Sequence, residues 1–115
     1  MTQASQKLTE KRCIPCEGGT QPLAGADAQA LMKQLDGRWK LVGDGKKLEA
    51  SFDCKNYFRT MALVNAIAWV AHQEDHHPDI SFGYNKVNVS YWTHTINGLS
   101  QNDFICAAKI DQLFK

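Results

Sequence analysis

Residues 80–94 read Ile-Ser-Phe-Gly-Tyr-Asn-Lys-Val-Asn-Val-Ser-Tyr-Trp-Thr-His, and this stretch decides the fold. Each half alternates apolar or aromatic residues with other residues, as a β-strand with two different faces does. Asn85 and Lys86 separate the halves, so the stretch predicts a hairpin of two antiparallel strands. The second arm places Val87, Val89 and Tyr91 on one face and Asn88, Ser90, Trp92 and His94 on the other.

A second hairpin is expected upstream, with arms at residues 38–42 and 47–53. Gly43-Asp44-Gly45 joins the arms, and glycine supplies the positive φ that a tight turn requires. Leu48, Ala50 and Phe52 alternate with polar and charged residues, which indicates a strand with one face in water. Two hairpins give four strands, and their apolar face needs a cover of helices.

Three helices are expected to provide that cover, over residues 26–35, 55–76 and 104–114. In the middle helix an apolar stripe at helical spacing predicts the buried face. Asp53 is the expected N-cap of this helix, and Pro78 prevents its continuation, so His76 and His77 should lie at its end. The stripe consists of Tyr57, Met61, Val64, Ala68 and Ala71, with Phe58, Ala62 and Trp69 beside it.

The resulting order is α-β-β-α-β-β-α with only hairpin links between strands. It predicts an α+β fold in which three helices pack on one face of a four-stranded antiparallel sheet. Residues 1–22 are polar and rich in Gly and Pro, so we expect a flexible N-terminal arm that carries the Cys-x-x-Cys pair Cys13 and Cys16. Residues 23–115 form the expected domain.

The amino-acid composition indicates a globular protein. The 115 residues include 43% hydrophobic and 22% charged residues with a net charge of +1, which is typical of one globular domain and not of a disordered chain. The balanced charge argues against direct binding of nucleic acid. The sequence contains no signal peptide or membrane-spanning stretch, so we expect a cytoplasmic protein with reduced cysteines and no membrane contact.

Polar residues that can do chemistry gather at the end of the middle helix, from His72 to His77. His72 and His76 have the i, i+4 spacing of paired zinc ligands, but Gln73 follows His72, so the His-Glu-x-x-His pattern is absent. Cys13 and Cys16 provide two further possible ligands. A zinc-binding protein therefore stays an alternative, although we expect no metal site.

A compound motif spans the second half of the chain: Asp75-His76-His77-Pro78-Asp79, then Tyr84-Asn85-Lys86-Val87, Thr93-His94, Gly98-Leu99-Ser100 with Asp103, and residues 107–111. This pattern resembles the pterin-4a-carbinolamine dehydratases, known in animals also as dimerization cofactors of a homeodomain transcription factor. The resemblance covers roughly residues 23–114. It implies a four-stranded antiparallel sheet with three helices, in agreement with the predicted order.

By position, His76, His77 and His94 match the catalytic histidines of the family. Asp75 and Asp103 match acidic positions of the pterin site, and Trp39 matches a tryptophan near the ligand. Two positions depart from the family: His72 stands where a glutamate is common, and Asn102 stands where a basic residue is common. Pro78, Ser90 and Trp92 complete the expected substrate-binding set: Pro78 follows His77, and the other two share the strand face of His94. Asp103 also fits a helix cap after Ser100, and Trp39 and Trp92 also fit plain packing.

The resemblance implies a lyase that removes water from 4a-hydroxytetrahydrobiopterin and so supports tetrahydropterin recycling. Imidazole suits this reaction because its ordinary pKa of about 6.5 allows it to give or take a proton near neutral pH. No cofactor is required. The expected partners are a small pterin substrate and further copies of the chain in a homodimer or homotetramer. The alternative is a non-catalytic binding module that uses the apolar face of residues 57–71.

Overall fold

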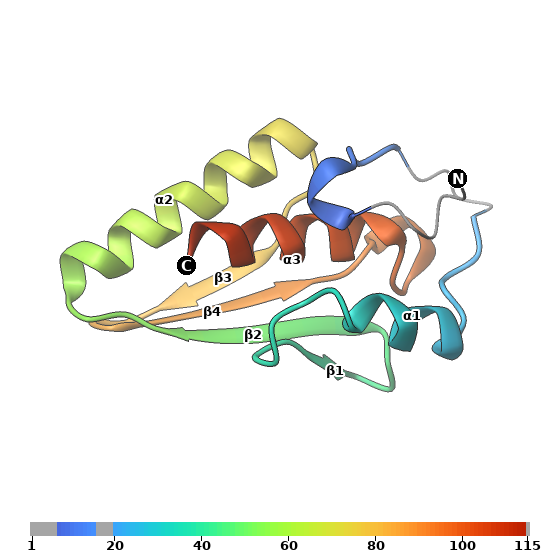
Figure 1. The fold of residues 1–115 in the computed structure, drawn as a ribbon, viewed down its shortest axis with the longest axis horizontal. Coiled ribbons are helices and arrows are strands. Elements are labelled where there is room, and N and C mark those ends of the chain that lie inside the picture. The colour runs from blue at the N-terminus through green and yellow to red at the C-terminus, as the bar shows by residue number, and fades with distance from the viewer. Residues whose placement is uncertain (1–6, 16–19, 115) are drawn as a thin grey trace.

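The computed structural model describes residues 7–15 and 20–114, and the arrangement of its helices and strands is shown in Figure 1. The expected order of helices and strands is confirmed, with two short 3-10 turns added. In chain order the elements are η2 (Leu8–Glu10), α1 (Gly25–Met32), β1 (Lys40–Val42), β2 (Lys47–Asp53), α2 (Tyr57–Glu74), β3 (Asp79–Phe82), β4 (Lys86–Tyr91), η3 (His94–Ile96) and α3 (Gln101–Leu113).

The four strands form one antiparallel sheet in the order β1-β2-β4-β3, so β2 and β4 are central. Leu48 pairs with Tyr91, Ala50 with Val89 and Phe52 with Val87. All six of these side chains are buried, and the alternate residues are more exposed. Because side chains alternate between the faces of a strand, this register brings the apolar residues of both hairpins onto one face.

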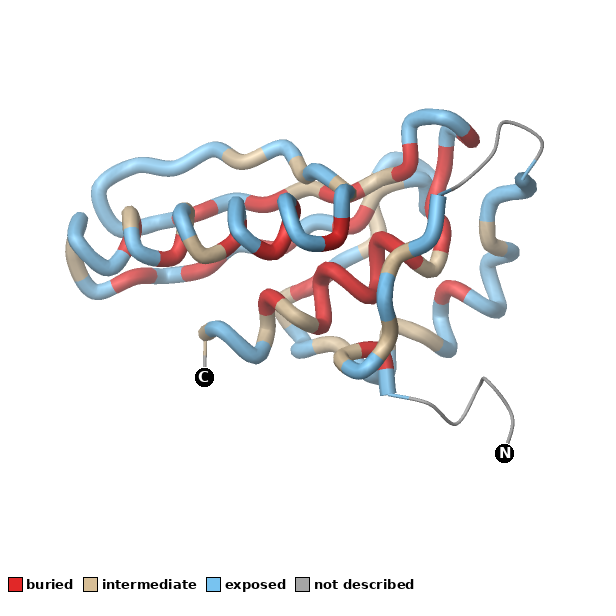
Figure 2. Tube along the Cα trace, turned by 90° about the horizontal axis from the view of Figure 1, so that it is seen from above, coloured by how far each residue is buried: buried red, intermediate tan, exposed pale blue. Residues whose placement is uncertain are grey.

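Two long helices, α2 and α3, lie across that face (Figure 1). The exposure of the chain differs sharply between them (Figure 2): α3 is buried along most of its length, whereas α2 alternates between buried and exposed residues. α1 contributes Ala28 to the same core. None of the described helices combines the length and the apolar character that crossing a membrane requires.

The buried side of α2 differs from the expected stripe. Tyr57, Phe58 and Trp69 are exposed, with Phe58 at 79%. Apolar residues occur around most of this helix, so helical spacing alone did not select the face that packs on the sheet. The residues that are buried are Thr60, Leu63, Ile67, Val70, Ala71 and Glu74.

The ends of α2 explain where the first two histidines lie. The cap at the start is Asn56, not Asp53, because the Asn56 side chain accepts the Arg59 N–H at 2.9 Å. At the other end Asp75 takes the left-handed conformation, with φ of 51°. This conformation ends the helix, and the chain leaves it at His76 as expected.

The described part of the N-terminal arm packs against the domain. Leu8 is only 1% exposed and belongs to the hydrophobic core, where η2 packs against α3. The Leu8 amide also donates to the Gln34 side chain at 2.9 Å. A single apolar residue among polar ones gave no periodic signal, so its burial was not visible in the sequence. Cys16 lies outside the described residues.

Candidate functional site

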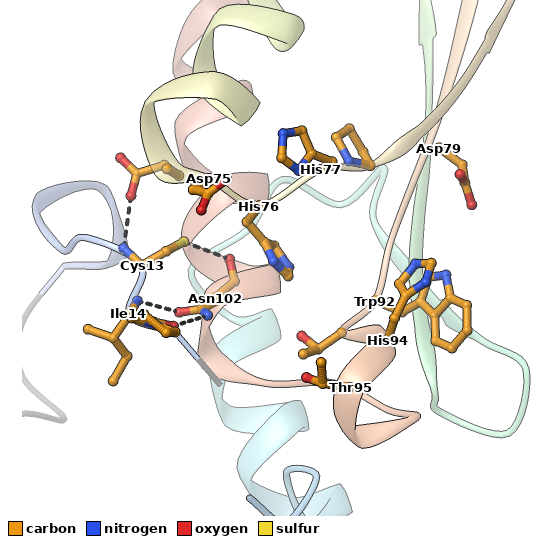
Figure 3. A pocket seen from close by; sticks show the side chains of 14 residues that line it. Cys13, Ile14, Asp75, His76, His77, Asp79, Trp92, His94, Thr95 and Asn102 are labelled. Atoms are coloured by element: carbon orange, nitrogen blue, oxygen red, sulfur yellow. Dashed lines mark hydrogen bonds between the residues drawn. The ribbon is translucent and has the colours of Figure 1, made fainter. Parts of the chain in front are cut away.

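A cavity of about 560 Å³ opens where the end of α2 meets the segment that follows β4. His76, His77 and His94 all line it, so the structure brings the three predicted histidines to one place. Figure 3 shows His76 and His77 coming from the end of α2 and His94 coming from the segment across the opening. His94 begins η3 and does not end β4, which stops at Tyr91.

His76 is held by a short hydrogen bond to a buried carboxylate. Its Nε2 lies 2.6 Å from Asp103 Oδ1, and Asp103 is 0% exposed. Asp103 is the third residue of α3, where a carboxylate also stabilises the positive end of a helix. The sequence left two interpretations of Asp103, a helix cap and a site residue. In the structure its carboxylate caps α3 at Ser100 and also contacts His76.

The second oxygen of Asp103 fixes the carboxylate in place. Oδ2 accepts the Ser100 N–H at 2.9 Å and the Thr93 hydroxyl at 2.8 Å. The Thr93 hydroxyl also lies 2.8 Å from the Ser100 hydroxyl. A buried carboxylate with several donors holds one orientation, because turning it would break all of these bonds. Asp103 therefore presents Oδ1 to His76 from a rigid position.

The surroundings of His76 raise its pKa above the ordinary value for histidine. Burial is the largest single influence and acts in the opposite direction, because it disfavours the charged ring. The hydrogen bond and the negative charge of Asp103 favour the imidazolium, and together with smaller effects from Cys106 and Asp75 they outweigh burial. His76 therefore keeps its proton to a higher pH than a free imidazole.

Two aromatic residues position the imidazole rings. The Tyr91 ring stacks on His76, with centroids 5.4 Å apart and 10° between planes, and the Tyr91 hydroxyl donates to the His76 carbonyl at 3.2 Å. On the other side Trp92 stacks on His94 with centroids 4.0 Å apart. The Trp92 indole N–H is buried and meets no acceptor among the described residues. Trp92 lines the same cavity, so this donor is available to a ligand that reaches it.

Asp75 and Pro78 also line the cavity, as the sequence suggested. Trp39 and Ser90 do not. Trp39 is 2% exposed in the core, with its ring against Phe52 and its Nε1 donating to Asp111 at 2.8 Å. Ser90 faces a different hollow, on the side of the sheet away from the helices. Trp39 was expected in the site from its family position and Ser90 from its strand face. Neither signal distinguishes a residue of the core or the sheet from one that faces the cavity.

The cavity has a wall that sequence reasoning missed. Residues 11–15, which we call the N-terminal strap, contribute Cys13, Ile14 and Pro15 to the lining. The Cys13 N–H donates to Glu74 Oε1 at 2.8 Å. The Asn102 side chain forms hydrogen bonds with both backbone groups of Ile14: it accepts from the N–H at 3.1 Å and donates to the carbonyl at 2.6 Å. Asn102 stands where the family commonly has a basic residue. This difference was the only sign in the sequence that residue 102 makes a contact particular to this chain.

Glu74 anchors the strap with more than one bond. It is 8% exposed and also forms ion pairs with Lys109 at 2.7 Å and Arg12 at 3.2 Å. Burial raises the pKa of Glu74, but the Cys13 amide and the two cations outweigh it and hold the pKa below its usual range. Glu74 therefore stays charged and keeps the strap against α2.

The residues considered for zinc have other neighbours. His72 is exposed and its ring lies tilted against that of Trp69, with centroids 5.4 Å apart and 33° between planes. Cys13 lies beside Cys106. Among residues 7–15 and 20–114, no three His, Cys, Asp or Glu side chains gather as a metal would require.

The chain is similar in sequence to known proteins. Residues 21–113 match the family model described as pterin 4 alpha carbinolamine dehydratase. A protein of Nitrosomonas europaea, named "Putative pterin-4-alpha-carbinolamine dehydratase", is 56% identical over 108 residues, which cover 94% of each chain. A protein of the same name from Nitrosospira multiformis is 57% identical over 108 residues, covering 94% of this chain and 93% of its own.

Two solved structures resemble the fold. A transcriptional coactivator/pterin dehydratase from Brucella melitensis matches with a TM-score of 0.77 and 28% identity, covering 82% of this chain and 99% of its own. A pterin dehydratase-like protein, described as a RuBisCO assembly factor in the α-carboxysome, matches with a TM-score of 0.58 and 28% identity, covering 65% and 87%. With the family model matched across the whole sheet and all three α-helices, the chain belongs to the pterin-4a-carbinolamine dehydratase family.

Proposed function

We propose that the protein dehydrates 4a-hydroxytetrahydrobiopterin to quinonoid dihydropterin and water, and thereby supports tetrahydropterin recycling. In this reaction the C4a–O bond breaks and the hydroxyl leaves as water after it accepts a proton. N5 loses its proton, and its electrons form the C4a=N5 double bond. The reaction therefore needs an acid near the hydroxyl and a base near N5, and no external cofactor.

His76 is our candidate for the acid. Asp103 raises its pKa, so a larger fraction of His76 carries a proton near neutral pH. Nε2 is engaged by Asp103 at 2.6 Å, which leaves Nδ1 as the ring nitrogen able to meet a substrate. After the proton transfer, the carboxylate would favour return of a proton to the ring and prepare it for the next cycle.

His94 is our candidate for the base, and His77 for positioning the pterin or its hydroxyl. His94 is exposed and stacked on Trp92, an arrangement that leaves it open to exchange protons with water. Asp75 and Pro78 adjoin His76 and His77 in the chain, also line the cavity, and complete the proposed binding surface. The imidazoles of His76 and His94 come from two sides of one opening, an arrangement that suits a flat pterin ring between them.

The single observation that carries the proposal is the His76–Asp103 pair in a cavity that also contains His77 and His94. The test is the rate of water loss from chemically generated carbinolamine, followed by absorbance with and without the protein. We expect a rate that rises in proportion to protein concentration above the uncatalysed rate in buffer. A rate equal to that of buffer at every protein concentration would reject the proposal.

A second candidate function is non-catalytic binding, through self-association or through a partner protein. Tyr57, Phe58 and Trp69 expose aromatic rings on α2, and large exposed apolar groups often mark an interface. The resemblance to a RuBisCO assembly factor shows that a protein of this shape has been described in an assembly role.

Light scattering tests this second candidate, with the Phe58→Ser variant as the comparison. We expect a homodimer or homotetramer for the natural chain and a smaller species for the variant. Monomers in both samples would argue against self-association through α2.

A further inference from the structure

Two thiols that the proposed reaction does not use lie close together, one in the strap and one in α3. Cys13 Sγ is 3.6 Å from Cys106 Sγ, although the two residues are 93 positions apart in the chain. Both are free thiols. A disulfide bond has a length of about 2.05 Å, so the sulfurs need to approach by only about 1.5 Å to bond.

The backbone around Cys13 is fixed so that its sulfur faces α3. Glu74 holds the Cys13 amide, and Asn102 holds both backbone groups of Ile14. Cys13 Sγ also lies 3.6 Å from the Asn102 carbonyl, on the same helix as Cys106. Figure 3 shows this arrangement, with the Cys13 side chain directed toward Asn102. Hydrogen bonds of the folded chain therefore hold the two thiols near each other.

We propose that Cys13 and Cys106 form a reversible disulfide bond that ties the strap to α3 when a peroxide is present. Cys13 is partly exposed, so peroxide reaches its sulfur first, the O–O bond breaks, and a sulfenic acid and one water result. Cys106 then attacks that sulfur, and the hydroxyl leaves as a second water with the remaining proton. In total two thiols lose two electrons and two protons, and the peroxide is reduced to two waters.

The two thiols differ in pKa, and this difference favours the second step. The pKa of the Cys106 thiol is lowered by the hydrogen bond from Cys13 and by the nearby His76, despite burial. The same hydrogen bond and burial raise the pKa of Cys13. Since the thiolate is the attacking species, the raised pKa slows the attack of Cys13 on peroxide, and the lowered pKa of Cys106 favours its attack on the sulfenic acid in the second step.

The disulfide would also change the protonation of His76 in the cavity. Cys106 follows Asp103 by three residues in α3, so the two side chains lie on the same side of that helix. The charge of Cys106 contributes to the raised pKa of His76. A disulfide carries no such charge, so the pKa of His76 should fall when the pair is oxidised.

Peptide mapping by mass spectrometry under non-reducing conditions tests the proposal. The natural full-length chain is treated with hydrogen peroxide, the remaining thiols are alkylated, and the protein is digested. We expect a peptide pair joined through Cys13 and Cys106, lost after treatment with dithiothreitol. A bond from Cys13 to Cys16, a bond between chains, or Cys106 recovered in alkylated form would each overturn the proposal.

Two variants sharpen this result. The Cys16→Ser, Cys54→Ser double variant retains only Cys13 and Cys106 of the four cysteines, and we expect it to form the bond as the natural chain does. The Cys106→Ala variant should form no intramolecular bond to residue 106, and its Cys13 should accumulate as sulfenic or sulfinic acid. A histidine NMR titration supplies a second readout, in which oxidation should lower the pKa of His76.

Discussion

The carboxylate of Asp103 joins the start of α3 to the imidazole of His76. One oxygen accepts the Ser100 amide at the first turn of the helix, and the other lies 2.6 Å from His76 Nε2. A single buried side chain therefore couples the local geometry of α3 to the protonation of a residue at the end of α2.

Replacement of Asp103 by Asn should lower the pKa of His76. The amide keeps a similar shape but removes the negative charge, so burial is no longer outweighed and disfavours the imidazolium. NMR titration of the His76 ring in the natural chain and in the Asp103→Asn variant measures the change. His72, which is exposed and whose ring lies against Trp69, is the internal control. An unchanged His76 titration would show that Asp103 does not set its protonation.

The raised pKa of His76 also predicts how stability depends on pH. A group whose pKa is higher in the folded than in the unfolded chain stabilises the fold fully below the unfolded pKa, about 6.5 for histidine. That contribution is lost as the pH rises through the folded pKa. Urea unfolding should therefore show the natural chain losing its advantage over His76→Gln as the pH rises above about 6.5. A difference that stays constant or grows with pH would contradict this sign.

The buried position of Trp39 predicts a change of stability without a change of chemistry. Trp39→Phe removes the hydrogen bond to Asp111 and should lower the free energy of unfolding by about 1–2 kcal/mol. Its dehydration rate, measured where the variant is folded, should match that of the natural chain. Trp69→Phe is the matched control, since Trp69 is 60% exposed and should cost little stability. A selective loss of activity in Trp39→Phe would instead place this residue in the site.

Asn102 should hold the strap in place. Asn102→Ala removes both side-chain bonds to the backbone of Ile14, at a cost of about 1–2 kcal/mol in the free energy of unfolding. Hydrogen exchange should show faster exchange of the Ile14 amide in the variant. Gln101→Ala, at the neighbouring position of α3, serves as the control. Equal exchange rates in both variants would show that Asn102 does not fix the strap.

The sheet and the order of helices were predictable because alternation and turn residues are local signals. The register of β2 and β4 follows from Leu48, Ala50 and Phe52 meeting the equivalent residues of the second hairpin. The glycine turn was also correct, since Gly43, Asp44 and Gly45 all have positive φ. The burial of α2 was not predictable in the same way, because apolar residues surround much of that helix and tertiary contacts choose the side that packs.

The site was predictable only in part. Three histidines could be assigned from a compound motif, but the contact between His76 and Asp103 joins segments 27 residues apart and follows from tertiary packing. The strap depends on Glu74 and Asn102, two polar residues whose burial no periodic pattern indicates. Conversely, Trp39 and Ser90 were expected in the site because they share a motif or a strand face with site residues.

The most direct test of the account compares dehydration of the carbinolamine by His76→Gln and by His72→Gln. Both variants remove one imidazole from α2 or its end, but only His76 lines the cavity and contacts Asp103. With folding verified by circular dichroism, we predict that His76→Gln loses about 100-fold or more of the catalysed rate, the usual size of general acid–base catalysis, while His72→Gln keeps it. Equal rates for the two variants would contradict the role of His76 in proton transfer.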